Sequence, residues 1–251
     1  MIAAVGAGTA VSAAAGAALG VGALKKKSKV LKVMAGICGA GAVGLGALTG
    51  WSVMAYKEFD YNGDRKLAKD IVEGTAAYVK IPDGGVGLDV GCGSGALTIA
   101  CARVNPNARM VGCDRWGKDY ASFSRDLCIR NAKAEGVENV SFRNGNALSL
   151  PFADEAFDAV TSNYVYHNIT GSDRQALIME TLRVLKKGGC FAIHDLMSPA
   201  YYGNTAKFAQ KLRDMGFQEV RLVDTTTGLF MDKKEATKMM LNGSKLLVGI
   251  K

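Results

Sequence analysis

The chain has 251 residues, of which 49% are hydrophobic, and a formal net charge of +8 at pH 7. This length allows one large α/β domain with an additional segment, but not two enzymes. Residues 1–56 contain five lysines and no acidic residue, which leaves 8 − 5 = +3 for the rest of the chain. A balance so close to neutral gives no indication of a nucleic-acid partner, and we expect none.

Two uncharged segments, residues 1–24 and 33–56, flank the lysine-rich stretch KKKSKVLK at 25–32. Each is long enough to cross a hydrocarbon core as a helix, which takes about 20 residues. We therefore predict that residues 1–56 form a hairpin of two hydrophobic helices that anchors the chain in a membrane. Glycines four residues apart, as at Gly46 and Gly50, would let such helices pack closely and form a homo-oligomer. A signal peptide or a disordered tail fits less well, because the start is not basic and the segment has few polar residues.

Residues 57–251 alternate between strand-like and helix-like stretches. Apolar runs predict strands at 86–90, 109–114, 140–144, 157–163, 190–195, 219–224 and 245–250. Helices are predicted at 95–104, 117–134, 172–186 and 204–215, and a short one from Asp232, with Glu235 three residues on as in a capping box. This order predicts an α/β domain with a doubly wound, mostly parallel seven-stranded sheet, whose ligands bind at the carboxyl ends of the strands.

The stretch GVGLDVGCGSGALTIA, residues 85–100, places three glycines at alternate positions after the first strand of this sheet. A strand that turns tightly into a helix directs free backbone N–H groups and a positive dipole end at a ligand. The spacing is G-x-G-x-G with Asp89 two residues before the first glycine, whereas nicotinamide enzymes use G-x-G-x-x-G. On this loop alone a dinucleotide cofactor stays open as an alternative.

The remaining motifs favour one family. LDVGCGSG, VGCDRW, GNALSLPFADEAFDAVTSNYVYHNI and RVLKKGGCFAIHD follow one another over residues 85–195 and together resemble a class I S-adenosylmethionine-dependent methyltransferase of the small-molecule group. The strands at 219–224 and 245–250 resemble the antiparallel hairpin that closes this fold. The resemblance covers nearly all of residues 60–251, but not the hydrophobic start.

The resemblance implies a set of residues that bind S-adenosylmethionine. Asp89 and the backbone of Gly91, Gly93 and Gly95 would hold the methionine part, Asp114 both ribose hydroxyls, Asn146 and Ala147 the adenine edge, and Asn163 would lie near the sulfonium through its backbone. Many relatives have Asp where this chain has Asn146, so the adenine contact is the part of the carry-over that the sequence supports least.

Two histidines follow the fourth and fifth strands, on the edge where a methyl acceptor would lie. An acceptor that carries a proton needs a nearby base, and His194, with Asp195 beside it, is the stronger candidate, followed by His167. The alternative for His167 is that many methyltransferases of this group carry a histidine at this place without a proton-transfer role. Tyr164 is expected to line the acceptor pocket, and the alternative for it is packing against the helix at 172–186. The two histidines and six cysteines form no cluster with metal-ligand spacing, and we expect no metal.

These features predict methyl transfer from S-adenosylmethionine to a small, lipophilic or membrane-associated acceptor. Two alternatives remain: a cytosolic small-molecule methyltransferase whose start tethers or oligomerises it, and a non-catalytic cofactor-binding membrane scaffold. A cytosolic cofactor and unpaired cysteines indicate a catalytic domain facing the cytoplasm. The lysines at 25–32 favour the opposite orientation if the hairpin crosses the membrane twice, so it either crosses against this bias or lies in the inner leaflet.

Overall fold

The computed structural model describes residues 12–15, 17–18, 29–117 and 122–251 and divides the chain into two compact units, Met1–Ala68 and Lys69–Lys251. Of the predicted first hydrophobic helix, residues 1–24, only 12–15 and 17–18 are described, and both stretches are helical. The rest of that helix, and residues 25–28 of the predicted turn, lie outside the described residues.

The helix α2, Lys29–Phe59, contains the second apolar segment. It begins inside the predicted turn, so the prediction of a turn over 25–32 is wrong for residues 29–32, where no proline or glycine interrupts the helix. Within the described residues, Val33–Phe59 is the one helix long and apolar enough to cross a membrane, with a mean hydropathy of 1.6. Thr49 and Ser52 donate their hydroxyls to carbonyls one turn earlier, both at 2.8 Å, which satisfies these groups without water.

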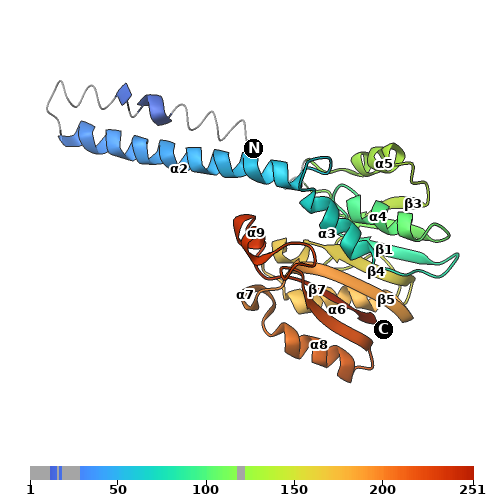
Figure 1. The fold of residues 1–251 in the computed structure, drawn as a ribbon. Coiled ribbons are helices and arrows are strands. Elements are labelled where there is room, and N and C mark those ends of the chain that lie inside the picture. Colours follow the sequence, from blue (N-terminus) through green and yellow to red (C-terminus); the bar gives the residue numbers. More distant parts are fainter. Residues whose placement is uncertain (1–11, 16, 19–28, 118–121) are drawn as a thin grey trace. The chain divides into compact units, whose positions relative to one another are not determined.

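The second unit contains a seven-stranded sheet with the strand order β3-β2-β1-β4-β5-β7-β6 (Figure 1). Its strands are β1 Val86–Val90, β2 Arg109–Asp114, β3 Val140–Asn144, β4 Phe157–Asn163, β5 Leu185–Leu196, β6 Gln218–Asp224 and β7 Ser244–Ile250. The first five run parallel, whereas β7 pairs antiparallel with both β5 and β6. The predicted doubly wound, mostly parallel sheet is therefore confirmed. The strand β5 is longer than predicted, because a bulge opposite β4 lets Leu185 pair with Phe157.

The helices of this unit follow the predicted order, but the helix predicted at 117–134 begins at Arg125, and the helix predicted at 172–186 ends at Arg183, before β5. They are α3 Leu67–Ala76, α4 Ala96–Val104, α5 Arg125–Ala134, α6 Arg174–Arg183, α7 Pro199–Tyr202, α8 Thr205–Asp214 and α9 Lys233–Lys238, with a 3-10 turn, η2, at Tyr166–Asn168. Two predicted caps are confirmed: the Asn204 side chain accepts from Lys207 N–H, and that of Asp232 accepts from Glu235 N–H. The helices α3 and α7 were not predicted.

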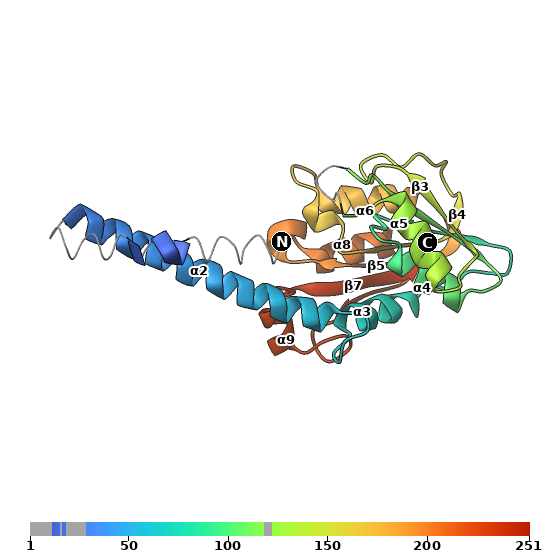
Figure 2. The same ribbon diagram turned by 90° about the horizontal axis from the view of Figure 1, so that it is seen from above.

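Helices cover both faces of the sheet (Figures 1 and 2). The main core lies between the strands and the helices α6 and α8, where Leu88, Val160 and Phe191 pack against Ile178 and Leu212. Because side chains alternate along a strand, Asp89, between two residues of this core, points to the opposite face, which carries α4. The carboxyl ends of β1, β2, β3 and β4 meet at one edge, and the candidate site lies there.

Candidate active site

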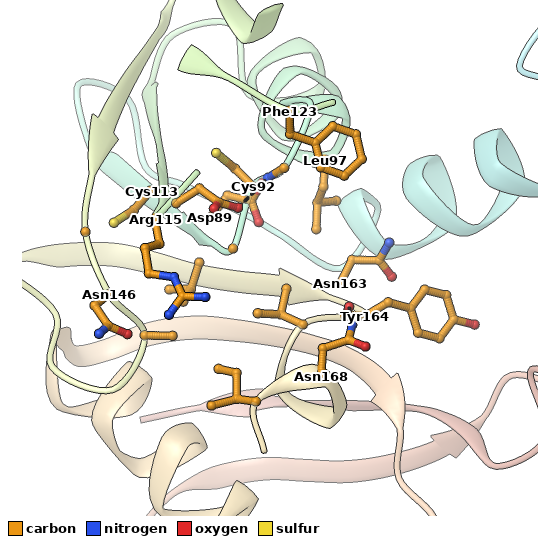
Figure 3. A pocket seen from close by; sticks show the side chains of 18 of the residues that line it. Asp89, Cys92, Leu97, Cys113, Arg115, Phe123, Asn146, Asn163, Tyr164 and Asn168 are labelled. Carbon is orange, nitrogen blue, oxygen red and sulfur yellow. Dashed lines mark hydrogen bonds between the residues drawn. The ribbon is translucent and has the colours of Figure 1, made fainter. Parts of the chain in front are cut away.

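A pocket of about 810 Å³ opens at this edge, where it is lined by residues from the loops after β1, β2, β3 and β4 (Figure 3). Such a volume lies in the upper part of the range of about 300–1,000 Å³ that is usual for small-molecule sites. Among the sequence-predicted residues, the pocket lining includes Asp89, Gly91, Gly93, Asp114, Asn146, Ala147, Asn163 and Tyr164. It includes neither Gly95 nor the two histidines.

The glycine loop brings its backbone close to the pocket. At Gly91 a Cβ atom would lie 2.4 Å from Val165, and the positive φ of 72° also requires glycine. At Gly93, where φ is 54°, the one described side chain that a Cβ atom would meet within 4 Å is the Phe123 ring, at 3.8 Å. The absence of side chains at this loop therefore leaves room for a ligand to touch the backbone.

Side chains from the loop after β2 and from α5 bind the carbonyls of the glycine loop. The Trp116 indole N–H and the Cys128 thiol both donate to the Gly93 carbonyl, at 3.0 and 3.2 Å, and the Asn131 amide donates to the Ser94 carbonyl at 2.9 Å. Since these carbonyls are bound, the loop is fixed in one orientation.

Gly95 does not itself line the pocket. It has a φ of 85° and precedes α4, and a Cβ atom there would lie 3.0 Å from the Phe142 ring and 3.2 Å from Cys128. The close packing of the loop against β3 and α5 explains this glycine, and a contact of its backbone with the cofactor stays a prediction.

Asp89 is a buried carboxylate at the floor of the pocket, with 1% of its surface exposed. The Thr98 hydroxyl donates to it at 2.6 Å. Burial raises the pKa of Asp89 to about 7, an effect that the hydrogen bond from Thr98 only partly offsets and that the nearby Asp114 reinforces. A cation beside Asp89 would stabilise its ionised form.

Asp114 ends β2 and places both carboxylate oxygens at the glycine loop. One oxygen accepts from Gly93 N–H at 2.8 Å and the other from Trp116 N–H at 2.9 Å. Each carboxylate oxygen has two acceptor positions, so the side chain retains the capacity for two further donors. Asp114 thus ties the ends of β1 and β2 together while it lines the pocket.

The loop after β3 forms the far end of the pocket. Asn146 uses its side-chain oxygen to accept from Leu148 N–H at 3.0 Å, which stabilises a tight turn. Arg115 extends into the pocket near this loop (Figure 3). A flat heteroaromatic group could lie between these loops, with Ala147 and Leu148 as apolar contacts.

Asn163 and Tyr164 line the pocket at the end of β4. Tyr164 has a φ of 53°, a strained conformation for a residue other than glycine. Its hydroxyl lies 2.7 Å from the Ser244 hydroxyl, and burial raises the pKa of the phenol. Figure 3 shows the ring pointing away from Asp89 and Arg115. The backbone and one face of Tyr164, rather than its hydroxyl, are therefore available to a ligand.

His194 is fully buried and does not line the pocket. Its Nδ1 lies 2.8 Å from the Asn163 side-chain oxygen, and its Nε2 lies 3.0 Å from the Thr225 hydroxyl. Burial lowers the pKa of His194 to about 3, although the neighbouring Asp195 acts in the opposite direction. Since a base needs a free ring nitrogen and both nitrogens of the buried His194 have partners, the geometry favours His167 over His194 as the base, the reverse of the order expected from the sequence.

His167 has a geometry better suited to a base. Its Nδ1 contacts the buried carboxylate of Asp195, and 17% of its side chain is exposed. Asp195 also accepts from the Tyr166 backbone and the Tyr202 hydroxyl, both at 2.8 Å, so the carboxylate is fixed. Within the described part of the chain, Nε2 of His167 has no hydrogen-bond partner. The ring lies 6.2 Å from that of Tyr164 but does not itself line the pocket.

Several pocket residues were not expected from the sequence. They are Val72 from α3, Leu97 from α4, and the loop residues Arg115, Phe123, Leu148, Val165, Asn168, Ile169 and Thr170. The loop residues follow the ends of predicted strands, and this position could have indicated that they line the pocket. Val72 could not be found in this way, because α3 was not predicted.

Comparison with known proteins places this chain among methyltransferases. A family model described as a methyltransferase domain matches residues 81–243. A demethylmenaquinone methyltransferase of Alkalihalophilus pseudofirmus is 35% identical over 119 residues, which cover 46% of each chain. The chain thus spans about half the length of the curated relatives it matches.

Solved structures with the same fold carry different activities in their names. The cyclase SpnF has a TM-score of 0.56 at 20% identity, covering 76% of this chain and 85% of its own. A geranyl diphosphate C-methyltransferase from Streptomyces coelicolor, in complex with S-adenosyl-L-homocysteine, has a TM-score of 0.54 at 19% identity, covering 78% and 83%. At these identities the likeness shows the fold alone.

Proposed function

Because the chain belongs to the methyltransferase-domain family, we propose that it transfers a methyl group from S-adenosylmethionine to a small, lipophilic acceptor held near a membrane. The observation that carries this proposal is the pocket, whose lining combines the glycine loop and the acidic side chains of Asp89 and Asp114 with apolar side chains.

The residues at the pocket fit S-adenosylmethionine. The absence of a side chain at Gly93 admits a ligand against the backbone, and the buried carboxylate of Asp89 gains from a cation such as the cofactor's ammonium group. Asp114 retains acceptor positions for two hydroxyls, as the ribose presents them. The loop of Asn146 and Ala147 would hold the adenine, and Arg115 would lie against its face.

When bound, S-adenosylmethionine supplies a methyl group on a sulfonium whose sulfur leaves with the electrons of the broken bond. The contribution of the protein is to hold the acceptor in line and to exclude water. Asn163 and Tyr164, at the end of β4, would orient the reacting groups. His167 would take the acceptor's proton on Nε2, while Asp195 stabilises the resulting imidazolium.

Apolar side chains also line the pocket, among them Val72, Leu97 and Ile169. Such a wall favours a lipophilic molecule over a sugar or a nucleotide. The relative from Alkalihalophilus pseudofirmus is named for demethylmenaquinone, a lipophilic quinone, and this supports the same acceptor class here. Residues 60–66 alone join the apolar helix α2 to α3, which carries Val72.

We further propose that α2 anchors the protein in a membrane, with the catalytic unit, residues 57–251, on the cytoplasmic side. The length and hydropathy of Val33–Phe59 support the anchor. The supply of S-adenosylmethionine in the cytosol supports the orientation. Small residues on α2, such as Gly46 and Gly50, would suit a homo-oligomer.

Incubation of the full-length protein with methyl-labelled S-adenosylmethionine and fractionated cell extract tests the proposed function. We expect the label in a membrane-lipid fraction, and not in the water-soluble metabolites. Label only in soluble metabolites would contradict the lipophilic acceptor, and no label in any fraction, with cofactor binding intact, would favour a non-catalytic scaffold.

A further inference from the structure

A buried chain of hydrogen bonds joins the pocket to the strands β6 and β7. It starts at Asn163, whose side-chain oxygen lies 2.8 Å from His194 Nδ1, and continues from His194 Nε2 to the Thr225 hydroxyl at 3.0 Å. Thr225 is fully buried and donates to the Ser244 carbonyl at 3.0 Å. Each link is a buried polar group with a partner, so removal of one leaves another unsatisfied.

A second branch returns from the same hairpin to the pocket. Ser244 donates its hydroxyl to the Leu241 carbonyl at 2.7 Å, which leaves its oxygen to accept from the Tyr164 hydroxyl at 2.7 Å. The backbone N–H of Tyr164 donates to the His194 carbonyl at 2.9 Å. Tyr164, whose backbone is strained, is thus fixed both through its side-chain hydroxyl and through its backbone N–H. Two consecutive pocket residues, Asn163 and Tyr164, are tied to Thr225 and Ser244.

The environment of His194 favours a neutral ring. Phe230 packs against it at 5.3 Å between ring centroids, and Tyr164 at 4.6 Å. The titratable groups that face it are Asp195, next to it on β5, and the Tyr164 phenol. The Asp195 carboxylate is occupied by donors from Tyr166, His167 and Tyr202, and it does not hydrogen-bond to His194.

We propose that His194 is a positioning residue, which sets the orientation of the Asn163 side chain at the pocket and fixes it to the hairpin of β6 and β7 through Thr225. It acts through Asn163 and never meets the acceptor. This inference rests on the proposed function only in that the ligand at the pocket is taken to be S-adenosylmethionine.

The protonation of the His194 ring determines which way the Asn163 side chain faces. The neutral ring of His194 carries one proton, so it can donate to Asn163 or to Thr225, but not to both. Because the Thr225 hydroxyl gives its own proton to the Ser244 carbonyl, it is left to accept from Nε2–H. When Nε2 carries the proton, Thr225 accepts it, and Asn163 donates its amide to Nδ1 and turns its oxygen to the pocket. An oxygen there suits a cationic sulfonium, so a ligand of this charge should favour the Nε2–H form.

Two substitutions that retain different halves of the imidazole test the proposal. The amide of His194→Asn lies where Nδ1 was and can still bond Asn163, whereas that of His194→Gln lies where Nε2 was and bonds only Thr225. We expect His194→Gln to weaken S-adenosylmethionine binding to the full-length protein about tenfold by calorimetry, and His194→Asn by less than about threefold. In an Asn163→Ala background the two variants should bind equally.

Equal losses from both variants in the presence of Asn163 would overturn the proposal, as would a large loss of turnover with unchanged affinity, which indicates a base. If neither variant folds, nitrogen-15 NMR of histidine in the unsubstituted protein decides. We expect one of the two histidines to show a neutral ring unchanged between about pH 5 and pH 8, with Nε2–H dominant when cofactor is bound. Titration of both rings near the usual histidine pKa would contradict the inference. Failure of S-adenosylmethionine to bind the unsubstituted protein would instead contradict the proposed function.

Discussion

Two buried carboxylates, at opposite ends of the site, differ in how the protein partners them. Asp195, on β5, accepts from the backbone of Tyr166 and Leu196 and from the side chains of His167 and Tyr202. Asp89, on β1, accepts from the Thr98 hydroxyl and lines the pocket, and burial raises its pKa to about 7. A fully partnered carboxylate serves the architecture, whereas one that is buried with few donors is suited to receive a cationic ligand.

The largest expected effect concerns the stability cost of Asp89. Its folded-state pKa of about 7 lies above the ordinary value of 3.8, so between these two values the folded state binds more protons than the unfolded state. The free energy of unfolding of the cofactor-free protein should therefore fall as the pH rises through this window, by roughly 4 kcal/mol at most. Above pH 7 the loss is complete.

The variant Asp89→Asn removes this titration without a change in shape. Its stability relative to the unsubstituted protein should rise with pH between about 4 and 7 and then stay constant. Chemical unfolding followed by Trp116 fluorescence, in a Trp51→Phe background, measures it. A stability difference independent of pH would show that burial does not raise the pKa of Asp89 in the folded protein.

The next effect concerns His167, which Asp195 orients. His167→Gln should lower turnover roughly 100-fold, because proton transfer by a positioned base contributes at least about that factor. The dissociation constant of S-adenosylhomocysteine should stay the same, since His167 does not line the pocket. Unchanged turnover would mean that the acceptor is already ionised and that the Asp195 end of the site has no catalytic part.

Asp114→Ala should weaken cofactor binding by about 1–3 kcal/mol, the usual cost of removing a charged hydrogen-bonding partner. Asp154→Ala is a matched control, since this exposed carboxylate pairs with Arg183 away from the pocket. Calorimetry with S-adenosylhomocysteine compares the two. Equal dissociation constants in the two folded variants would remove Asp114 from the cofactor site.

The smallest effect is expected at Val72, an apolar residue in the pocket lining. Val72→Ala should raise the KM for a lipophilic acceptor roughly threefold to tenfold, because it removes two methyl groups from the wall. Val79→Ala removes the same atoms from a buried site outside the pocket. A shift in the cofactor's dissociation constant, with the acceptor KM unaltered, would show that Val72 contacts the cofactor and not the acceptor.

The sheet could be predicted well from the sequence, because each strand is a short apolar run and most helices carry caps such as Asn204 and Asp232. Asp89, Asp114 and Asn163, at or near the ends of their strands, could be placed at one edge of the sheet for the same reason. The helix α3 was missed, although Leu67, Ile71 and Val72 repeat at helical spacing and are buried. With α3 the prediction also missed the wall that Val72 forms.

The ranking of the two histidines could not be predicted, since it depends on side-chain direction. Successive residues of β5 point to opposite faces, and the sequence does not show that Thr225 and Asn163 enclose His194. Nor does it show that Asp195 meets His167, which lies in a turn after another strand. Pairs that are distant in sequence and close in space carry no signal in one sequence alone.

Calorimetry on the full-length protein in detergent, with S-adenosylmethionine and with NADH, tests the central claim most directly. The pocket of Asp89, Gly93 and Asp114 predicts binding of S-adenosylmethionine and S-adenosylhomocysteine in the micromolar range and no heat from NADH. Binding of S-adenosylmethionine should also weaken as the pH falls below about 7, where Asp89 takes up its proton. Binding of NADH without binding of S-adenosylmethionine would contradict the account.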